Sequence, residues 1–130
     1  MGAIGRATDT IQARKEFLDR LAIWRDAMAN ENNLRFQLEA ARHLADTTGK
    51  WPDEFEDEGA EMKKIGDAKR QVRNAVWGAT VALFDYLEAV GEAERAVLSA
   101  DAPMARRVVE LERESAQRWE DGIKYAFTTF

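Results

Sequence analysis

Residues Ala75 to Gly91 read AVWGATVALFDYLEAVG and contain only two charged side chains, Asp85 and Glu88. The chain as a whole is 33% charged, so this segment is unusually apolar. Apolar residues within it and on both sides recur at three- and four-residue steps, which is the spacing of one face of an α-helix. The pattern predicts a long helix whose buried face is formed by Met62, Ile65, Val72, Val76, Ala79, Leu83, Tyr86, Val90, Ala93 and Val97.

A second apolar strip lies beside this face and consists of Trp77, Thr80 and Phe84. Alanine and glycine occupy most of the remaining side, and a helix that is apolar or small nearly all round is normally buried. We therefore predict that this helix is the central one of a helical bundle, or that it also receives a partner. In the second case Trp77 and Phe84 are candidate partner contacts.

Turn and capping signals set the ends of the central helix. Gly49 and Pro52 mark a loop, because glycine suits the left-handed position after a helix and proline forces the residue before it into an extended shape. Asp53 is then the expected N-cap of the central helix. This helix is expected to run to about position 90, and either to end at Gly91 or to continue as far as Ser99.

A first helix is predicted to begin near Asp9, which is spaced as a capping box with Gln12. Asparagine is a poor helix former, and three of the four residues Asn30–Asn33 are asparagine. We therefore expect a kink or a break in this helix at 30–33. Its apolar stripe consists of Ile11, Phe17, Leu18, Leu21, Trp24 and Met28.

A third helix is predicted to begin at Pro103, since proline is favoured in the first turn of a helix. Its predicted apolar stripe consists of Met104, Val108, Leu111, Ser115, Trp119, Ile123 and Ala126. Three long helices with short connections predict an all-α fold, an antiparallel bundle in which residues 1–130 form a single domain. Trp24, Trp77 and Trp119 lie on apolar stripes and are most simply interpreted as core residues.

The composition restricts the chemistry. The chain has no cysteine, which excludes disulfides and thiolate sites, and it has no apolar run long enough to cross a membrane, so a cytoplasmic location is expected. The only histidine, His43, follows Glu39 by four residues and is most simply a surface residue beside a glutamate. We find no nucleophile–base pair, phosphate loop or metal-ligand spacing, and we expect no catalytic residue, cofactor or metal.

The charges are unevenly distributed. Residues 53–61 carry six acidic and no basic side chains, although the chain as a whole has a net charge of only −5. Basic residues follow at once, and four of them fall within about a third of the helix circumference, namely Lys63, Lys69, Arg70 and Arg73. Such a strip is able to follow a nucleic-acid backbone, but the acidic net charge of the chain favours the simpler interpretation that it neutralises acidic residues of neighbouring helices.

In size and all-helical character the chain is similar to the small helical subunits of multi-subunit CRISPR effector complexes. That resemblance implies a ribonucleoprotein subunit that contacts a nucleic-acid backbone through basic side chains. On this hypothesis Lys63, Lys69, Arg70 and Arg73 are the contacting residues.

Aromatic residues outside the predicted core favour a different function, a non-enzymatic helical interaction subunit of a larger protein assembly or a self-associating protein. Besides Trp77 and Phe84, the candidate partner contacts are Trp51, Tyr125, Phe127 and Phe130. Trp51 lies in a loop, and the three tail aromatics point in different directions around a helix. A third possibility is an acidic inhibitor or immunity-type protein that uses residues 53–61 against a basic partner.

Overall fold

The computed structural model describes residues 2–129, with side chains as far as Tyr125. The described residues form three helices and no strand: α1 (Ala3–Thr48), α2 (Glu58–Leu98) and α3 (Pro103–Thr129). The helices pack against each other, so the predicted all-α fold is confirmed. The chain divides into two compact units. The three-helix unit contains the residues up to Arg20 and from Gly78 onward, and the two-helix unit contains Leu21–Trp77.

The first helix differs from its prediction at its start and in its continuity. It begins at Ala3, and Asp9 is not a cap but lies inside the helix, 3.8 Å from the guanidinium Nη1 of Arg6. It also continues without interruption through Asn30–Asn33, so it is not broken there. Asparagine costs a helix well under 1 kcal/mol per residue, which the packing of buried residues such as Leu38 outweighs.

The second helix begins later than predicted. Its N-cap is Asp57 rather than Asp53, because the Asp57 carboxylate accepts a hydrogen bond of 2.9 Å from the amide of Ala60. Gly49 has a φ of 75°, the left-handed conformation that was predicted for it. Between these points the chain folds back on itself: the indole Nε1 of Trp51 donates a hydrogen bond of 2.7 Å to the carbonyl of Glu56.

The predicted face of α2 is largely confirmed, since most of its residues are buried, including Tyr86 and Val90 with no exposed surface. Met62 is an exception and is 53% exposed. The second strip is not buried: Trp77 is 71% exposed and Phe84 is 64% exposed. The prediction of Trp77 as a core residue is therefore wrong, because the helix buries only one of its two apolar strips.

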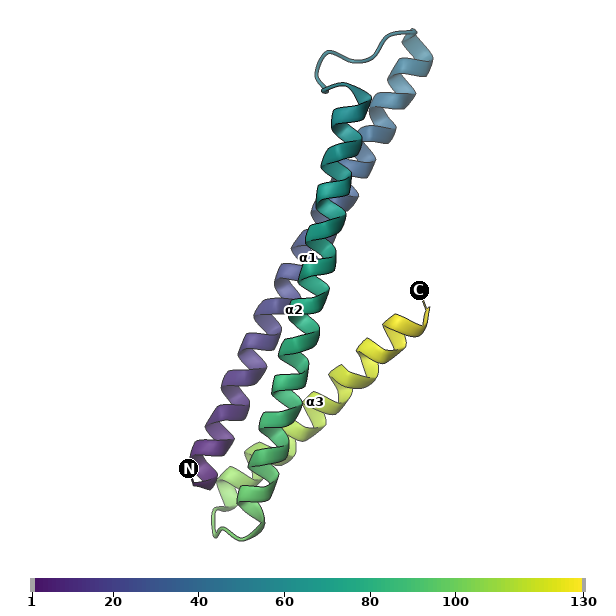
Figure 1. Ribbon diagram of the computed structural model, residues 1–130. Helices are drawn as coiled ribbons and strands as arrows, with labels where there is room; N and C mark the ends of the chain where they lie inside the picture. The colour runs from purple at the N-terminus through teal and green to yellow at the C-terminus, as the bar shows by residue number, and fades with distance from the viewer. Residues whose placement is uncertain (1, 130) are drawn as a thin grey trace. The chain divides into compact units, whose positions relative to one another are not determined.

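The core of the three-helix unit is built at one end from small residues. Figure 1 shows the start of α1, the end of α2 and the start of α3 side by side there. Small side chains allow helices to approach closely, and such close packing leaves little room for a larger side chain at any position of the cluster. The cluster consists of Ala3, Ala7, Ala93, Val97, Ala105 and Val109.

Aromatic rings form the next part of this core. Phe17 has no exposed surface, and its ring lies 6.4 Å from that of Tyr86 in a stacked arrangement. The ring of Trp119 meets Phe17 edge-on, with the centroids 5.4 Å apart. Trp119 is itself 38% exposed and so lies at the edge of the core. Each helix of the unit thus contributes one ring to a single aromatic cluster.

The third helix is rotated about its axis relative to its predicted stripe. Met104 is 85% exposed and Leu111 is 46% exposed, although both were predicted to be buried. The buried positions are instead Ala105, Val109, Glu112 and Ala116. The prediction was wrong because Glu112, a charged residue, lies in the core, and because Ala105 and Ala116 are buried in place of larger apolar side chains.

Ion pairs connect α2 to both of its neighbours in the three-helix unit. The guanidinium of Arg6 on α1 lies 2.9 Å from the carboxylate of Glu92. Arg113 on α3 donates two hydrogen bonds, of 2.5 and 3.0 Å, to the two carboxylate oxygens of Glu94. The Arg113 guanidinium lowers the pKa of Glu94 below its ordinary value near 4.5. Both pairs are partly exposed, so each contributes modestly to stability.

Replacing Ala93 by leucine should lower the free energy of unfolding by about 2 kcal/mol, because the residue is fully buried among close-packed helices. Urea denaturation followed by circular dichroism measures this change. The control is Ala29→Leu, at an exposed position of α1, which should change the stability by less than about 0.5 kcal/mol. Equal effects of the two substitutions would show that the cluster is not tightly packed.

The Glu94–Arg113 pair should make the protein sensitive to acid. A carboxyl whose pKa is lower in the folded state contributes stability above its unfolded pKa, and this stability is lost as the pH falls through the folded pKa. Urea midpoints should therefore decrease below about pH 4.5, and Glu94→Gln should reduce that decrease. Glu88→Gln, at an exposed position of the same helix, is the control and should follow the wild type.

Candidate functional site

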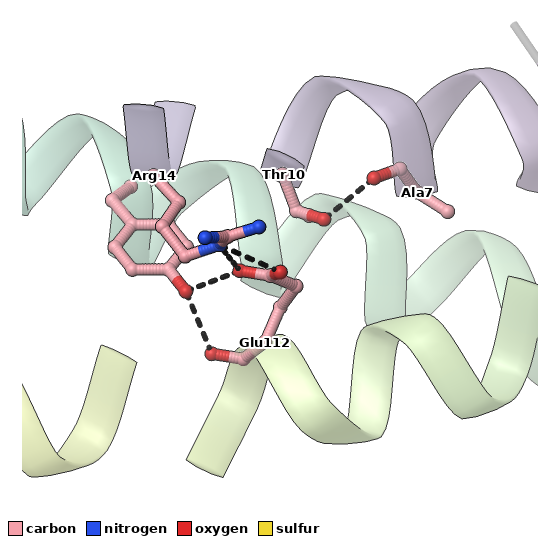
Figure 2. A network of polar contacts seen from close by, with 5 residues as sticks. Ala7, Thr10, Arg14 and Glu112 are labelled. Carbon is pink, nitrogen blue, oxygen red and sulfur yellow. Dashed lines mark hydrogen bonds and ion pairs between the residues drawn. The ribbon is translucent and has the colours of Figure 1, made fainter. Parts of the chain in front are cut away.

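The most constrained polar group of the three-helix unit is the carboxylate of Glu112, which is 7% exposed. Arg14 on α1 donates hydrogen bonds of 3.0 and 3.2 Å from its Nε to the two carboxylate oxygens. The Tyr86 hydroxyl on α2 donates a short hydrogen bond to Oε2 and lies 3.2 Å from the Glu112 carbonyl. Figure 2 shows the Arg14 guanidinium facing this carboxylate. The Thr10 hydroxyl points instead toward the carbonyl of Ala7, to which it donates a hydrogen bond of 2.6 Å.

This cluster, Arg14–Tyr86–Glu112, is a network of hydrogen bonds that joins the three helices of the unit. Burial, and then the hydrogen bond to Glu112, raise the pKa of the Tyr86 hydroxyl to about 12, so it stays a proton donor at neutral pH. Tyr86 has no exposed surface and Glu112 is 7% exposed, so both side chains are shielded from solvent. A buried carboxylate is costly unless it is paired and hydrogen-bonded. Here Arg14 on α1 and Tyr86 on α2 supply the partners of Glu112, which itself belongs to α3.

The four predicted nucleic-acid contacts all lie on α2 in the two-helix unit, and all are exposed. Arg70 forms an ion pair with Asp67, three residues before it. Among the residues that the structure describes, the other three form no ion pair. Neutralisation of a neighbouring helix by this strip is therefore not seen in the described part of the chain. The three side chains are Lys63, Lys69 and Arg73.

The predicted partner contacts are divided between the two units. Trp51 and Trp77 belong to the two-helix unit, whereas Phe84 and Tyr125 belong to the three-helix unit and lie on different helices. Trp51 is half-buried, and besides its hydrogen bond to Glu56 it lines a shallow cleft of about 340 Å³. Tyr125 is 72% exposed. The side chain of Phe127 and the whole of Phe130 fall outside the described residues.

Sequence reasoning missed an apolar surface that α1 and α3 form in the three-helix unit. On α1, Ile4, Ile11 and Leu18 recur every seven residues, and Ile4 is 73% exposed. On α3, Met104 and Leu111 are also seven residues apart and are exposed because the helix is rotated. We name these five residues the α1–α3 apolar face. The seven-residue spacing of the three α1 residues was the sequence pattern that could have revealed this face. Two of them, Ile11 and Leu18, had instead been predicted to lie on the buried apolar stripe of the first helix.

Contacts between the helices show that the two halves of this face lie on the same side of the unit. Glu112 on α3 pairs with Arg14 on α1, whereas Arg113, one residue on, pairs with Glu94 on α2. At 100° per residue, Met104 and Leu111 then lie beyond Glu112 on the side of α3 away from α2. On α1, Arg6 faces α2, and the same geometry places Ile4 and Leu18 on the side away from α2.

No group of three acidic or histidine side chains in the described part of the chain is placed to hold a metal ion. His43 is exposed, and its imidazole takes part in no hydrogen bond or ion pair with the described residues. Within residues 2–129, no helix is both long enough and apolar enough to cross a membrane.

Comparison with protein-family models, with curated proteins and with solved structures gives no match to this chain. The function is therefore inferred from the residues and the contacts described above.

Removing the carboxylate of Glu112 should destabilise the protein more than removing the hydroxyl of Tyr86. Glu112→Ala leaves a phenol and a guanidinium without their acceptor and should cost about 3 kcal/mol, whereas Tyr86→Phe should cost about 1 kcal/mol. Urea denaturation at neutral pH measures both. Losses below about 0.5 kcal/mol for both variants would contradict a structural role for the Arg14–Tyr86–Glu112 cluster.

The Tyr86 pKa also predicts sensitivity to alkali. A group whose pKa is raised in the folded state contributes stability below its unfolded pKa, and this stability is lost as the pH rises through the folded pKa. The free energy of unfolding should therefore fall between pH 10 and about pH 12 in the wild type. It should fall less in Tyr86→Phe, and identical profiles for the two proteins would contradict the assignment.

Proposed function

We propose that this protein is a non-enzymatic helical interaction subunit of a larger protein assembly, and that it binds a partner helix on the α1–α3 apolar face. The observation that carries the proposal is the seven-residue spacing of apolar residues on two neighbouring helices, of which Ile11 is half-buried and the other four are exposed. Seven residues advance an α-helix by about 10.5 Å, so a third helix with apolar residues at the same spacing is able to pack along both. We expect this assembly to be cytoplasmic.

The distribution of large and small side chains supports a binding function. More than half of the buried apolar residues in the described part of the chain are alanines, while large side chains remain exposed. Exposed apolar surface costs about 25 cal/mol per Å², so a chain that buries alanine and exposes isoleucine and leucine gains stability when a partner covers them. The exposed side chains of the face include Ile4 at 73%, Met104 at 85% and Leu111 at 46%.

The charges beside the face indicate what the partner helix is like. The next side chain beyond Ile4 around α1 is Lys15, and the next beyond Leu111 around α3 is Arg118. Both are basic and exposed. We therefore expect the partner helix to carry an apolar stripe at three- and four-residue steps, flanked by acidic residues.

The acidic run at 53–61 offers less support for an inhibitor of a basic partner, because several of its carboxylates are already paired. Lys64 lies 3.4 Å from carboxylate oxygens of both Glu56 and Glu61. Arg42 pairs with Glu58 at 2.8 Å. These internal partners reduce the charge that the run presents to another protein.

The test uses Leu111→Glu, which places a charge in the α1–α3 apolar face, and Phe84→Glu, a matched control on the exposed side of α2. The wild-type chain should self-associate or bind an apolar dye when it is purified alone, and Leu111→Glu should reduce dye binding much more than the control. Proteins recovered with the tagged chain from its host are then purified separately and recombined. Leu111→Glu should weaken the complex at least about tenfold, in keeping with one buried apolar anchor.

Three results would overturn the proposal. The first is a wild-type monomer that binds no apolar dye, since the exposed face would then not behave as a binding surface. The second is a reconstituted complex that Phe84→Glu weakens and Leu111→Glu leaves intact, which would place the contact on the second strip of α2. The third is a purified partner whose binding segment is not helical.

A further inference from the structure

The outward side of α2 in the two-helix unit carries a second surface, separate from the α1–α3 apolar face. At 100° per residue, five basic or aromatic side chains between Gly59 and Trp77 fall within about a third of the helix circumference. This arc is centred away from the buried side chains Ile65 and Ala68. We name the five residues the basic–aromatic strip: Lys63, Lys69, Arg70, Arg73 and Trp77.

No acidic residue of this stretch of α2 lies within the arc. Glu61 and Asp67 are the only two acidic residues between Gly59 and Trp77. Glu61 is 3% exposed and is held by Lys64 and by the amide of Glu56. Asp67 lies outside the arc and pairs with Arg70. The strip is therefore locally basic in a chain whose net charge is −5, and Lys63, Lys69 and Arg73 pair with no described side chain.

Trp77 gives this surface a second property. Trp77 is 71% exposed, and Ala75, two residues earlier, is buried on the opposite side of the helix. Arg73 precedes Trp77 by one helical turn, and Arg70 precedes it by two, so cations and the indole follow one another along the helix. A flat aromatic ring beside cations is the combination that stacks on an unpaired base and holds the adjoining phosphates.

We propose that the basic–aromatic strip binds single-stranded nucleic acid, with Trp77 stacking on a base and Lys63, Lys69, Arg70 and Arg73 contacting phosphates. The cations extend over about 15 Å of the helix axis, which suits a chain of regularly spaced charges better than a single anion. A single strand is favoured over a duplex because stacking on an exposed indole requires an unpaired base.

The experiment measures fluorescence anisotropy of labelled oligonucleotides of about 20 nucleotides, oligo-dT and oligo-A RNA, with the full chain at several salt concentrations between about 50 and 200 mM. Four phosphate contacts on a single strand predict a slope of about −2.8 in log K against log salt. The double variant Lys63→Ala, Arg73→Ala should reduce this slope to about −1.4. Trp77→Ala should weaken binding about tenfold and leave the slope unchanged.

The matched control is Arg25→Ala, Lys50→Ala, which removes two exposed charges of the same unit from outside the strip and should bind as the wild type does. Circular dichroism establishes that every variant is folded, which is expected because all the changed side chains are exposed. Leu111→Glu should bind the oligonucleotides normally, so failure of this proposal and failure of the proposed protein interaction are distinguishable.

Several outcomes would overturn the proposal. No binding by the wild type at about 50 mM salt, or equal losses in the strip variants and in the control, would remove the strip as a binding surface. Equal or tighter binding of a duplex would exclude base stacking on Trp77. Tighter binding of an oligo-glutamate peptide than of either oligonucleotide would assign the strip to an acidic protein partner instead.

Discussion

One buried carboxylate determines how the three-helix unit is assembled. A carboxylate in a helical core is stable only if its charge is paired and its oxygens are hydrogen-bonded, and Glu112 obtains both from Arg14 on α1 and Tyr86 on α2. Because Glu112 contacts both Arg14 and Tyr86, the rotation of α3 about its axis is set by these two contacts. Because side chains on a helix keep fixed angles to one another, that rotation turns Leu111 and Met104 outward. The apolar surface of the unit is thus a consequence of its polar core.

Close packing of small residues has a comparable effect. Ala7, Ala93 and Ala105 bring the helix ends of the three-helix unit together, and helices packed through alanine leave no space between them for large side chains. Ile4 and Met104, at these helix ends, therefore remain on the surface. A partner that covers these exposed side chains would remove apolar surface from water, which is the physical basis for proposing an interaction subunit.

The two proposed surfaces differ in kind and lie in different units. The α1–α3 apolar face relies on buried area and on a partner of matching spacing, whereas the basic–aromatic strip relies on charge and on one exposed indole. Neither uses the Arg14–Tyr86–Glu112 cluster, whose function is to hold the helices that display the apolar face. The two proposed surfaces therefore have no residue in common.

Local sequence signals determined the fold class, the start of α3 and most of the buried face of α2, because apolar spacing and the turn residues Gly49 and Pro103 are local properties. They also placed the cations of the basic–aromatic strip on one side of α2, since angles around a helix follow from residue number. The side of α3 that is buried, and the exposure of Trp77, depended on tertiary structure. Glu112 is stable in the core only because the other two helices supply its partners. Likewise, the neighbouring helices determine which of the two apolar strips of α2 is covered. Neither outcome follows from the sequence of α3 or α2 taken alone.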